Sequence, residues 1–91
     1  RTFDYPREWD AYPGHYRTPN PWEPNFRIVV RKGKLLFLTA EEEEPVTPLE
    51  GGLFRVGEDY SAERLRFDAI MDGKALQANL SGIPYGRFFA P

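Results

Sequence analysis

Four consecutive glutamates, at positions 41–44, are the residues of this 91-residue chain whose types most directly suggest chemistry. Carboxylate oxygens are the ligands that Ca²⁺ prefers, but a calcium loop spaces them around a bend that often contains Gly or Asn. Successive side chains of an extended segment point in opposite directions, so four adjacent glutamates do not converge on one ion. The run therefore predicts a solvated, self-repelling hairpin tip before Pro45 and no metal site.

Catalysis would need His15, the one histidine, or one of the two serines, Ser61 and Ser81. A catalytic histidine works beside an orienting carboxylate and a nucleophile, and Asp10 is the carboxylate nearby in sequence. Neither serine lies in a Gly-x-Ser-x-Gly turn or has a lysine three residues later. Cysteine is absent, which excludes thiolate chemistry and disulfides. We expect this chain not to be an enzyme by itself and to use no cofactor.

The numbers of acidic and basic residues limit the kinds of partner that the chain can bind. Twelve basic and fourteen acidic residues give a net charge of -2, which offers no field for nucleic acid or an anionic membrane. Nine of the basic residues are Arg, but they are scattered among acidic residues, as on a solvated surface. No apolar run approaches the roughly 18 residues that span a bilayer. We expect neither a nucleic-acid nor a membrane partner, and, because the chain begins with Arg, a piece of a longer protein.

Residues 1–25 combine five prolines with six aromatic rings, a mixture too apolar for a free linker and too rich in proline for a long helix. We expect residues 1–10 to form an ordered arm. A single helical turn is predicted over residues 6–10, since Pro is tolerated at a first helical position and Asp4 could cap the free amides behind it.

Candidate contacts for another domain or a ligand lie in and beyond this arm: His15, Asn20, Trp22, Tyr12 and Tyr16. An aromatic ring offers an apolar face and a polar edge, so the rings could stack on sugars or bases. Packing is the preferred interpretation, because an eight-stranded barrel is just wide enough to be filled by side chains. Trp22 is the expected exception, since Pro21 and Pro24 hold it in a loop.

The clearest architectural signal is residues 64–80, two alternating strands joined by the turn pair Asp72-Gly73. Lys32-Gly33 joins residues 26–31 to residues 34–39 in the same way. Further short strands are expected over residues 11–18, 45–49, 53–56 and 85–90. About eight strands at spacings of roughly ten residues, without a sustained helical period, predict an all-β antiparallel barrel or sandwich over residues 11–91.

Several segments, taken in order, resemble the C-terminal domain appended to serine hydrolases of the class C beta-lactamase, penicillin-binding-protein and D-aminopeptidase type. The resemblance lies in a Tyr-x-Gly-x-Tyr opening at residues 12–17, a Gly-containing hairpin at 28–37, a Gly-x-Phe turn at 49–54, and a final hairpin and closing strand at 65–73 and 86–89. Two departures occur: Pro48 precedes Leu49, and two glycines precede Leu53-Phe54.

The resemblance implies an eight-stranded, up-and-down, lipocalin-like barrel whose hydrolase chemistry resides in a separate domain with Ser-x-x-Lys and Tyr-x-Asn motifs. This sequence has neither motif, so no catalytic residue is carried over. The implied function is an accessory domain that packs on the catalytic domain and shapes substrate access or oligomerisation. Its contacts are expected at His15, Trp22 and the loop around Asn20, with the tip at residues 41–44 as a second candidate.

The alternative is a free-standing barrel that holds a small hydrophobic ligand between residues such as Phe37, Phe54 and Phe67. A small domain without a disulfide has little stability to spare for a cavity. This argument favours a filled interior and the accessory domain.

Overall fold

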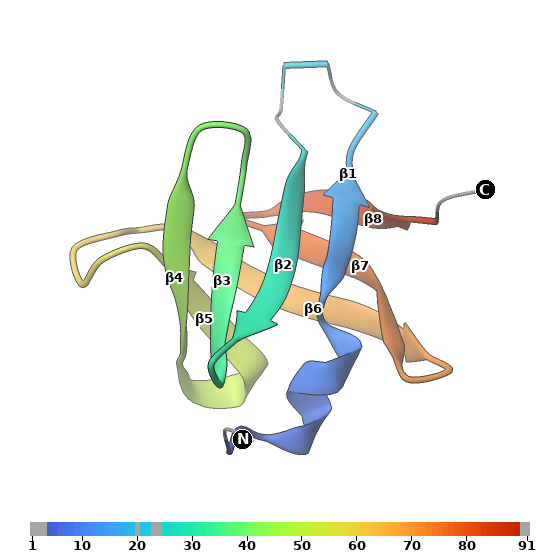
Figure 1. The fold of residues 1–91 in the computed structure, drawn as a ribbon. Helices are drawn as coiled ribbons and strands as arrows, with labels where there is room; N and C mark the ends of the chain where they lie inside the picture. The colour runs from blue at the N-terminus through green and yellow to red at the C-terminus, as the bar shows by residue number, and fades with distance from the viewer. Residues whose placement is uncertain (1–3, 20, 23–24, 90–91) are drawn as a thin grey trace.

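The computed structural model describes residues 4–19, 21–22 and 25–89, and within them eight antiparallel strands form a closed barrel (Figure 1). The strands in chain order are β1 (Gly14–Arg17), β2 (Phe26–Arg31), β3 (Lys34–Leu38), β4 (Glu43–Pro48), β5 (Leu53–Val56), β6 (Arg64–Met71), β7 (Lys74–Leu80) and β8 (Ile83–Phe88). Each strand pairs with the next, and β8 returns to pair with β1. The predicted all-β, eight-stranded up-and-down barrel is confirmed.

Tight hairpin turns set the register. Both predicted turn pairs adopt positive φ at both positions, 55° and 77° at Lys32-Gly33 and 52° and 72° at Asp72-Gly73. This geometry matches the twist of antiparallel strands. A third turn of the same kind, Ser81-Gly82 with φ of 50° and 90°, joins β7 to β8 and was not predicted. The last strand therefore begins at Ile83, two residues before its expected start.

The glutamate run is only partly in a hairpin tip, in contrast to the prediction. Glu43 and Glu44 belong to β4, where they pair with Leu38 and Phe37, because the ladder with β3 continues past Pro45. The turn itself spans residues 39–42. Thr39 organises it, since its N–H donates to the Glu42 carbonyl at 2.9 Å and its hydroxyl accepts from the Glu42 N–H at 3.1 Å.

Two short 3-10 helices, η1 (Arg7–Ala11) and η2 (Glu50–Gly52), complete the fold. The predicted turn at the start of the chain corresponds to η1, but the prediction that Asp4 caps it is wrong. Pro6 occupies the N-cap position without a side-chain cap, and its carbonyl accepts from the Trp9 N–H at 3.0 Å. Trp9 is buried and lies edge-on to Phe54, so η1 covers one end of the barrel. In the described ranges no helix is long and apolar enough to cross a membrane.

Aromatic side chains fill the interior. The core cluster consists of Trp9, Tyr16, Phe26, Ile28, Leu35, Phe37, Val46, Phe54, Val56, Leu65, Ala78 and Tyr85. Phe26 stacks on Phe37 with ring centroids 4.6 Å apart, and Tyr12 stacks on Phe67 at 4.0 Å. Large rings bury much area per residue, which lets a short chain without disulfides build one continuous core.

A charged side chain, Arg87 of β8, is half-buried at the end of the barrel that η1 covers. Its Nε donates to the Ala75 carbonyl at 2.6 Å, and its Nη2 donates to the Ala11 carbonyl at 3.0 Å and to the Tyr16 hydroxyl at 3.1 Å. The Tyr16 hydroxyl in turn donates to the Tyr12 carbonyl at 2.6 Å. One guanidinium therefore connects β8, β7, β1 and the end of η1.

Tyr16→Phe tests this connection. Tyr16 is fully buried, and burial raises its pKa to about 12, so its hydroxyl is protonated at neutral pH. The substitution removes an acceptor of Arg87 and the donor to Tyr12, and we expect it to lower the free energy of unfolding by about 1–3 kcal/mol. Urea denaturation measures this change. Tyr60→Phe, at a side chain 89% exposed, is the matched control, and equal stability of the two variants would contradict the expectation.

Candidate ligand-binding site at the barrel mouth

Two hollows lie at the end of the barrel opposite η1, and we call this end the mouth. It is bordered by the turn at residues 39–42, by the loop at residues 57–63 and by the start of the turn after β7. In an up-and-down barrel these connections lie at the same end because they follow alternate strands. Two adjoining hollows of about 270 Å³ and 380 Å³ open here and share Phe37, Glu42, Glu63 and Leu80.

Apolar side chains form the floor of the mouth. Phe37, Val56 and Tyr85 are buried core residues that also line the hollows, and Leu80 is packed against the same core. The mouth is therefore continuous with the filled interior and ends at the rings that fill it.

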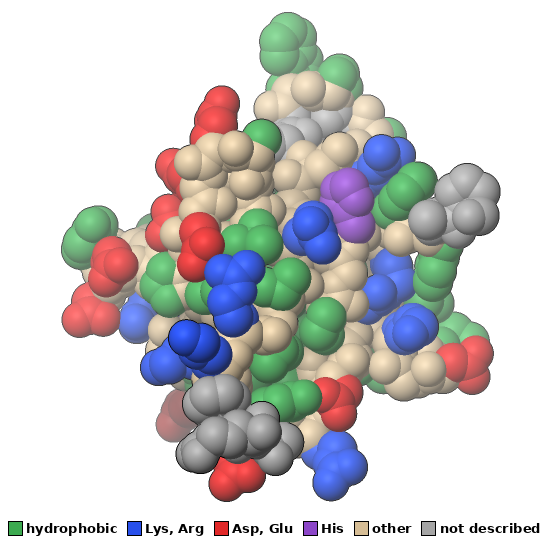
Figure 2. Space-filling view, viewed as in Figure 1, with side chains coloured by type: hydrophobic (Ala, Val, Ile, Leu, Met, Phe, Trp, Pro, Cys, Tyr) green, Lys and Arg blue, Asp and Glu red, His purple; other side chains and the backbone are tan. Residues whose placement is uncertain are grey.

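Carboxylates form the rim: Glu41, Glu42, Glu44, Glu58 and Glu63. Neither hollow has a lysine or arginine among its lining residues. Figure 2 shows acidic side chains along the edge of the molecule where the connections after β3 and β5 lie. A concave surface lined by one sign of charge concentrates its field, so this mouth attracts positive groups and repels anions.

The pKa of Glu44 responds to its position among these carboxylates. Its pKa is raised above the ordinary value for Glu, first by partial desolvation and then by the charge of Glu42 and a hydrogen bond with it, with a further contribution from Glu58. Like charges in proximity disfavour ionisation. The mouth thus carries negative charge that its own side chains do not neutralise.

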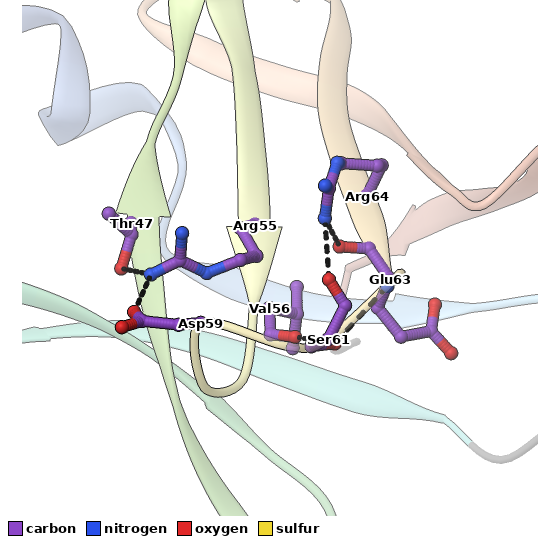
Figure 3. A network of polar contacts seen from close by, with 7 residues as sticks. All are labelled: Thr47, Arg55, Val56, Asp59, Ser61, Glu63 and Arg64. Carbon is purple, nitrogen blue, oxygen red and sulfur yellow. Dashed lines mark hydrogen bonds and ion pairs between the residues drawn. The ribbon is translucent and has the colours of Figure 1, made fainter.

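Ser61 holds the loop at residues 57–63 in place (Figure 3). Its hydroxyl donates to the Val56 carbonyl at 2.6 Å and accepts from the Glu63 N–H at 3.2 Å. Arg64 Nη1 donates to the carbonyls of Ser61 and Glu63 at 2.9 Å and 3.0 Å. The Ser61 hydroxyl, a candidate nucleophile by residue type, is thus a structural group in this loop.

The same loop is also fixed from outside the mouth. Gly57 has φ of 102°, a conformation that favours glycine, and its N–H donates to the Pro45 carbonyl at 2.9 Å. Arg55 Nη2 forms an ion pair at 3.1 Å with Asp59, and Figure 3 shows both side chains beside Thr47. Asp59 is almost fully exposed, so the pair contributes at most about 1 kcal/mol. Backbone bonds therefore hold the loop more than this pair does.

Of the outside contacts proposed from the sequence, the tip at residues 41–44 contributes Glu41, Glu42 and Glu44 to the mouth, whereas Tyr12, Tyr16, His15 and Trp22 are not among the residues that line its hollows. Tyr12 and Tyr16 lie in or against the core, as the packing interpretation expects. His15 lies on β1, edge-on to the Phe88 ring at 5.8 Å. Trp22 is 88% exposed, and Asn20 lies outside the described residues.

The carboxylate nearest to His15 in sequence has another role. Asp10 accepts a hydrogen bond from the Tyr5 hydroxyl at 2.7 Å. Among the described residues, no group of three His, Asp or Glu side chains is arranged to hold a metal ion.

The mouth could not be recognised in the sequence, because the carboxylates of its rim come from two separate segments. Glu42 and Glu44 belong to the glutamate run, whereas Glu58 and Glu63 follow β5. The number and order of the predicted strands could have indicated it, because the connections after the third and fifth strands of an up-and-down barrel lie at the same end.

Searches of the chain against protein-family models, curated proteins and solved structures found no match.

Glu42→Gln tests the electrostatics of the mouth. Removing the Glu42 charge leaves less repulsion on Glu44, and we expect the pKa of Glu44 to fall toward the ordinary value for Glu. A pH titration of the side-chain carboxyl carbons by NMR measures it. Glu50→Gln, in η2 at the other end of the barrel, is the control that leaves the Glu44 pKa unchanged. An unchanged Glu44 pKa in Glu42→Gln contradicts the described proximity.

Proposed function

We propose that this chain is a non-catalytic accessory domain of a beta-lactamase-like serine hydrolase, which packs on the catalytic domain and shapes substrate access or supports oligomerisation. The main support is the position of the segments that carry the resemblance. Its opening segment, residues 12–17, contains β1, and its closing segment, residues 86–89, contains the end of β8. These strands pair with each other, Tyr16 opposite Arg87, to close the barrel.

The outer face of this seam supplies the contact surface in the proposal. His15 and Phe88 are paired neighbours there, and together with Val29 of β2 they line a broad hollow. The Arg17 guanidinium lies 3.9 Å from the centroid of the Phe88 ring, and Phe89, which follows β8, is 60% exposed. Adjacent exposed apolar side chains are typical of protein interfaces. His15, a contact proposed from the sequence, is part of this surface.

The alternative function is a free-standing barrel that binds a small hydrophobic ligand. The rings expected to surround that ligand contact other rings instead: Phe54 lies edge-on to Phe67 with centroids 5.8 Å apart, and Phe37 stacks on Phe26. An interior ligand would have to displace these contacts. The interior packing therefore favours the accessory domain.

The coding sequence on both sides of these 91 codons tests the proposal. We expect it to encode, in the same reading frame, a domain with Ser-x-x-Lys and Tyr-x-Asn motifs. A reading frame without such a domain contradicts the proposal.

In the whole protein, Phe89→Ser should lower kcat/KM at least about threefold, since exposed apolar anchors contribute on the order of 1 kcal/mol to an interface. Steady-state kinetics with a chromogenic ester or amide measures the effect. The free energy of unfolding of the isolated domain should remain unchanged, because the Phe89 ring is mostly exposed there. Met71→Ser, at an apolar side chain of β6 that is also 60% exposed and lies away from the seam, is the matched control, and equal kinetics of both variants argue against this contact surface.

A further inference from the structure

We propose that the barrel mouth binds a primary ammonium group carried on an apolar body. No residue of the seam that supplies the contact surface of the proposed accessory domain takes part. The second contact candidate, the tip at residues 41–44, contributes Glu41, Glu42 and Glu44 to the rim, and the two proposals are tested separately, the first by the coding sequence and the second by titration of this chain.

The shape of the mouth defines the site. The hollows are about 270 Å³ and 380 Å³ in volume, comparable with the smaller ligand pockets of proteins. Their floor consists of the buried side chains Phe37, Val56 and Tyr85 and of Leu80. An apolar chain or ring of a ligand can cover this floor without entering the filled core.

The loop that forms one wall of the site is held without a ligand. Ser61 is bonded to Val56 and Glu63, and the Ser81 hydroxyl donates to Glu63 Oε1 at 2.5 Å. Ser81 also accepts from the Arg64 N–H at 3.2 Å, which ties the turn after β7 to the start of β6. A preformed wall lowers the ordering cost of binding.

The rim determines the sign of the charge that the site takes. Its carboxylates stand around the hollows, and the lining residues include no lysine or arginine. The Arg64 guanidinium, which is close to this loop, donates to the backbone carbonyls of Ser61 and Glu63. The pKa of Glu44 is raised by partial desolvation and then by the charges of Glu42 and Glu58, and a cation in the mouth offsets these charges.

The arrangement favours an organic cation over a metal ion. A Ca²⁺ ion needs six to eight oxygen ligands within about 2.6 Å. Among the residues that the structure describes, no three acidic or histidine side chains are placed for such a site. An ammonium needs fewer oxygen ligands than Ca²⁺, since one or two rim carboxylates and water can accept from its three N–H donors while its apolar body covers the floor. The 89% exposed Tyr60 ring, also at the rim, adds a face for cation–π contact.

The test is an NMR titration of the 91-residue chain with three probes of one shape, namely 4-phenylbutylamine, 4-phenylbutanol and 4-phenylbutyrate. We expect the amine to shift the amides of the mouth, at Phe37, at residues 57–63 and at Leu80, and to bind at least about fivefold more tightly than the alcohol at low salt. The carboxylate probe should bind most weakly. Raising the ionic strength from about 0.02 M to about 0.3 M should weaken only the amine, because salt screens an exposed charge.

A pair of double variants with the same change in net charge locates the site. Glu42→Gln with Glu58→Gln should reduce the affinity for 4-phenylbutylamine at least about fivefold, because both carboxylates line the mouth. Glu8→Gln with Glu50→Gln changes carboxylates of η1 and η2, at the other end of the barrel, and should leave the affinity unchanged. All four side chains lie in surface segments, so both variants should fold.

Two further probes identify the source of the ammonium and exclude a metal. A short peptide with an acetylated N-terminus and the sequence Phe-Lys-amide presents the same group on a lysine, and its affinity relative to 4-phenylbutylamine shows whether a peptide or a free amine fits better. Calcium chloride is the metal probe. The proposal is overturned if the alcohol binds as tightly as the amine, if the two double variants bind alike, or if Ca²⁺ shifts the mouth amides at lower concentration than the amine.

Discussion

The half-buried guanidinium of Arg87 is the interaction on which the closure of the barrel depends. A charge inside a protein is tolerated only where hydrogen bonds replace its hydration. Three acceptors from Ala75, Ala11 and Tyr16 do so here, and they belong to β7, to η1 and to β1. The seam between the first and last strands is thus fixed by one side chain as well as by its backbone ladder.

That placement constrains the residues around it. At Gly14, φ is 159°, and a Cβ there would overlap the Arg87 guanidinium, so a larger residue would displace the guanidinium from its three hydrogen bonds. Gly14 in β1, the Tyr16 hydroxyl and the end of η1 all contact or leave room for the Arg87 guanidinium, so their residue types depend on it. Arg87 and η1 close one end of the barrel. At the other end, the floor of the mouth is formed by side chains of the same aromatic core.

Much of the fold could be predicted from the sequence because its determinants are local. Lys32-Gly33 and Asp72-Gly73 specify tight turns, and alternation over residues 26–31 matches β2. Ser81-Gly82 was missed because Ser is a weaker turn signal than Asp or Asn. The half-burial of Arg87 could not be predicted from the sequence, since a charged residue in an alternating strand is expected to face solvent. The mouth was harder to predict, because its carboxylates come from two segments that only the pairing of β3 to β6 brings to one end of the barrel.

The central claim is that Arg87 stabilises the closed end of the barrel, and that the local stability of the mouth at the other end does not depend on Arg87. Native-state amide hydrogen exchange of the Arg87→Met variant tests it most directly. We expect faster exchange at the Trp9 and Tyr12 amides, which are bonded within and after η1, and unchanged protection at the Gly57 and Ser61 amides. Unchanged exchange at Trp9 and Tyr12, or equal loss of protection at both ends, would contradict the claim.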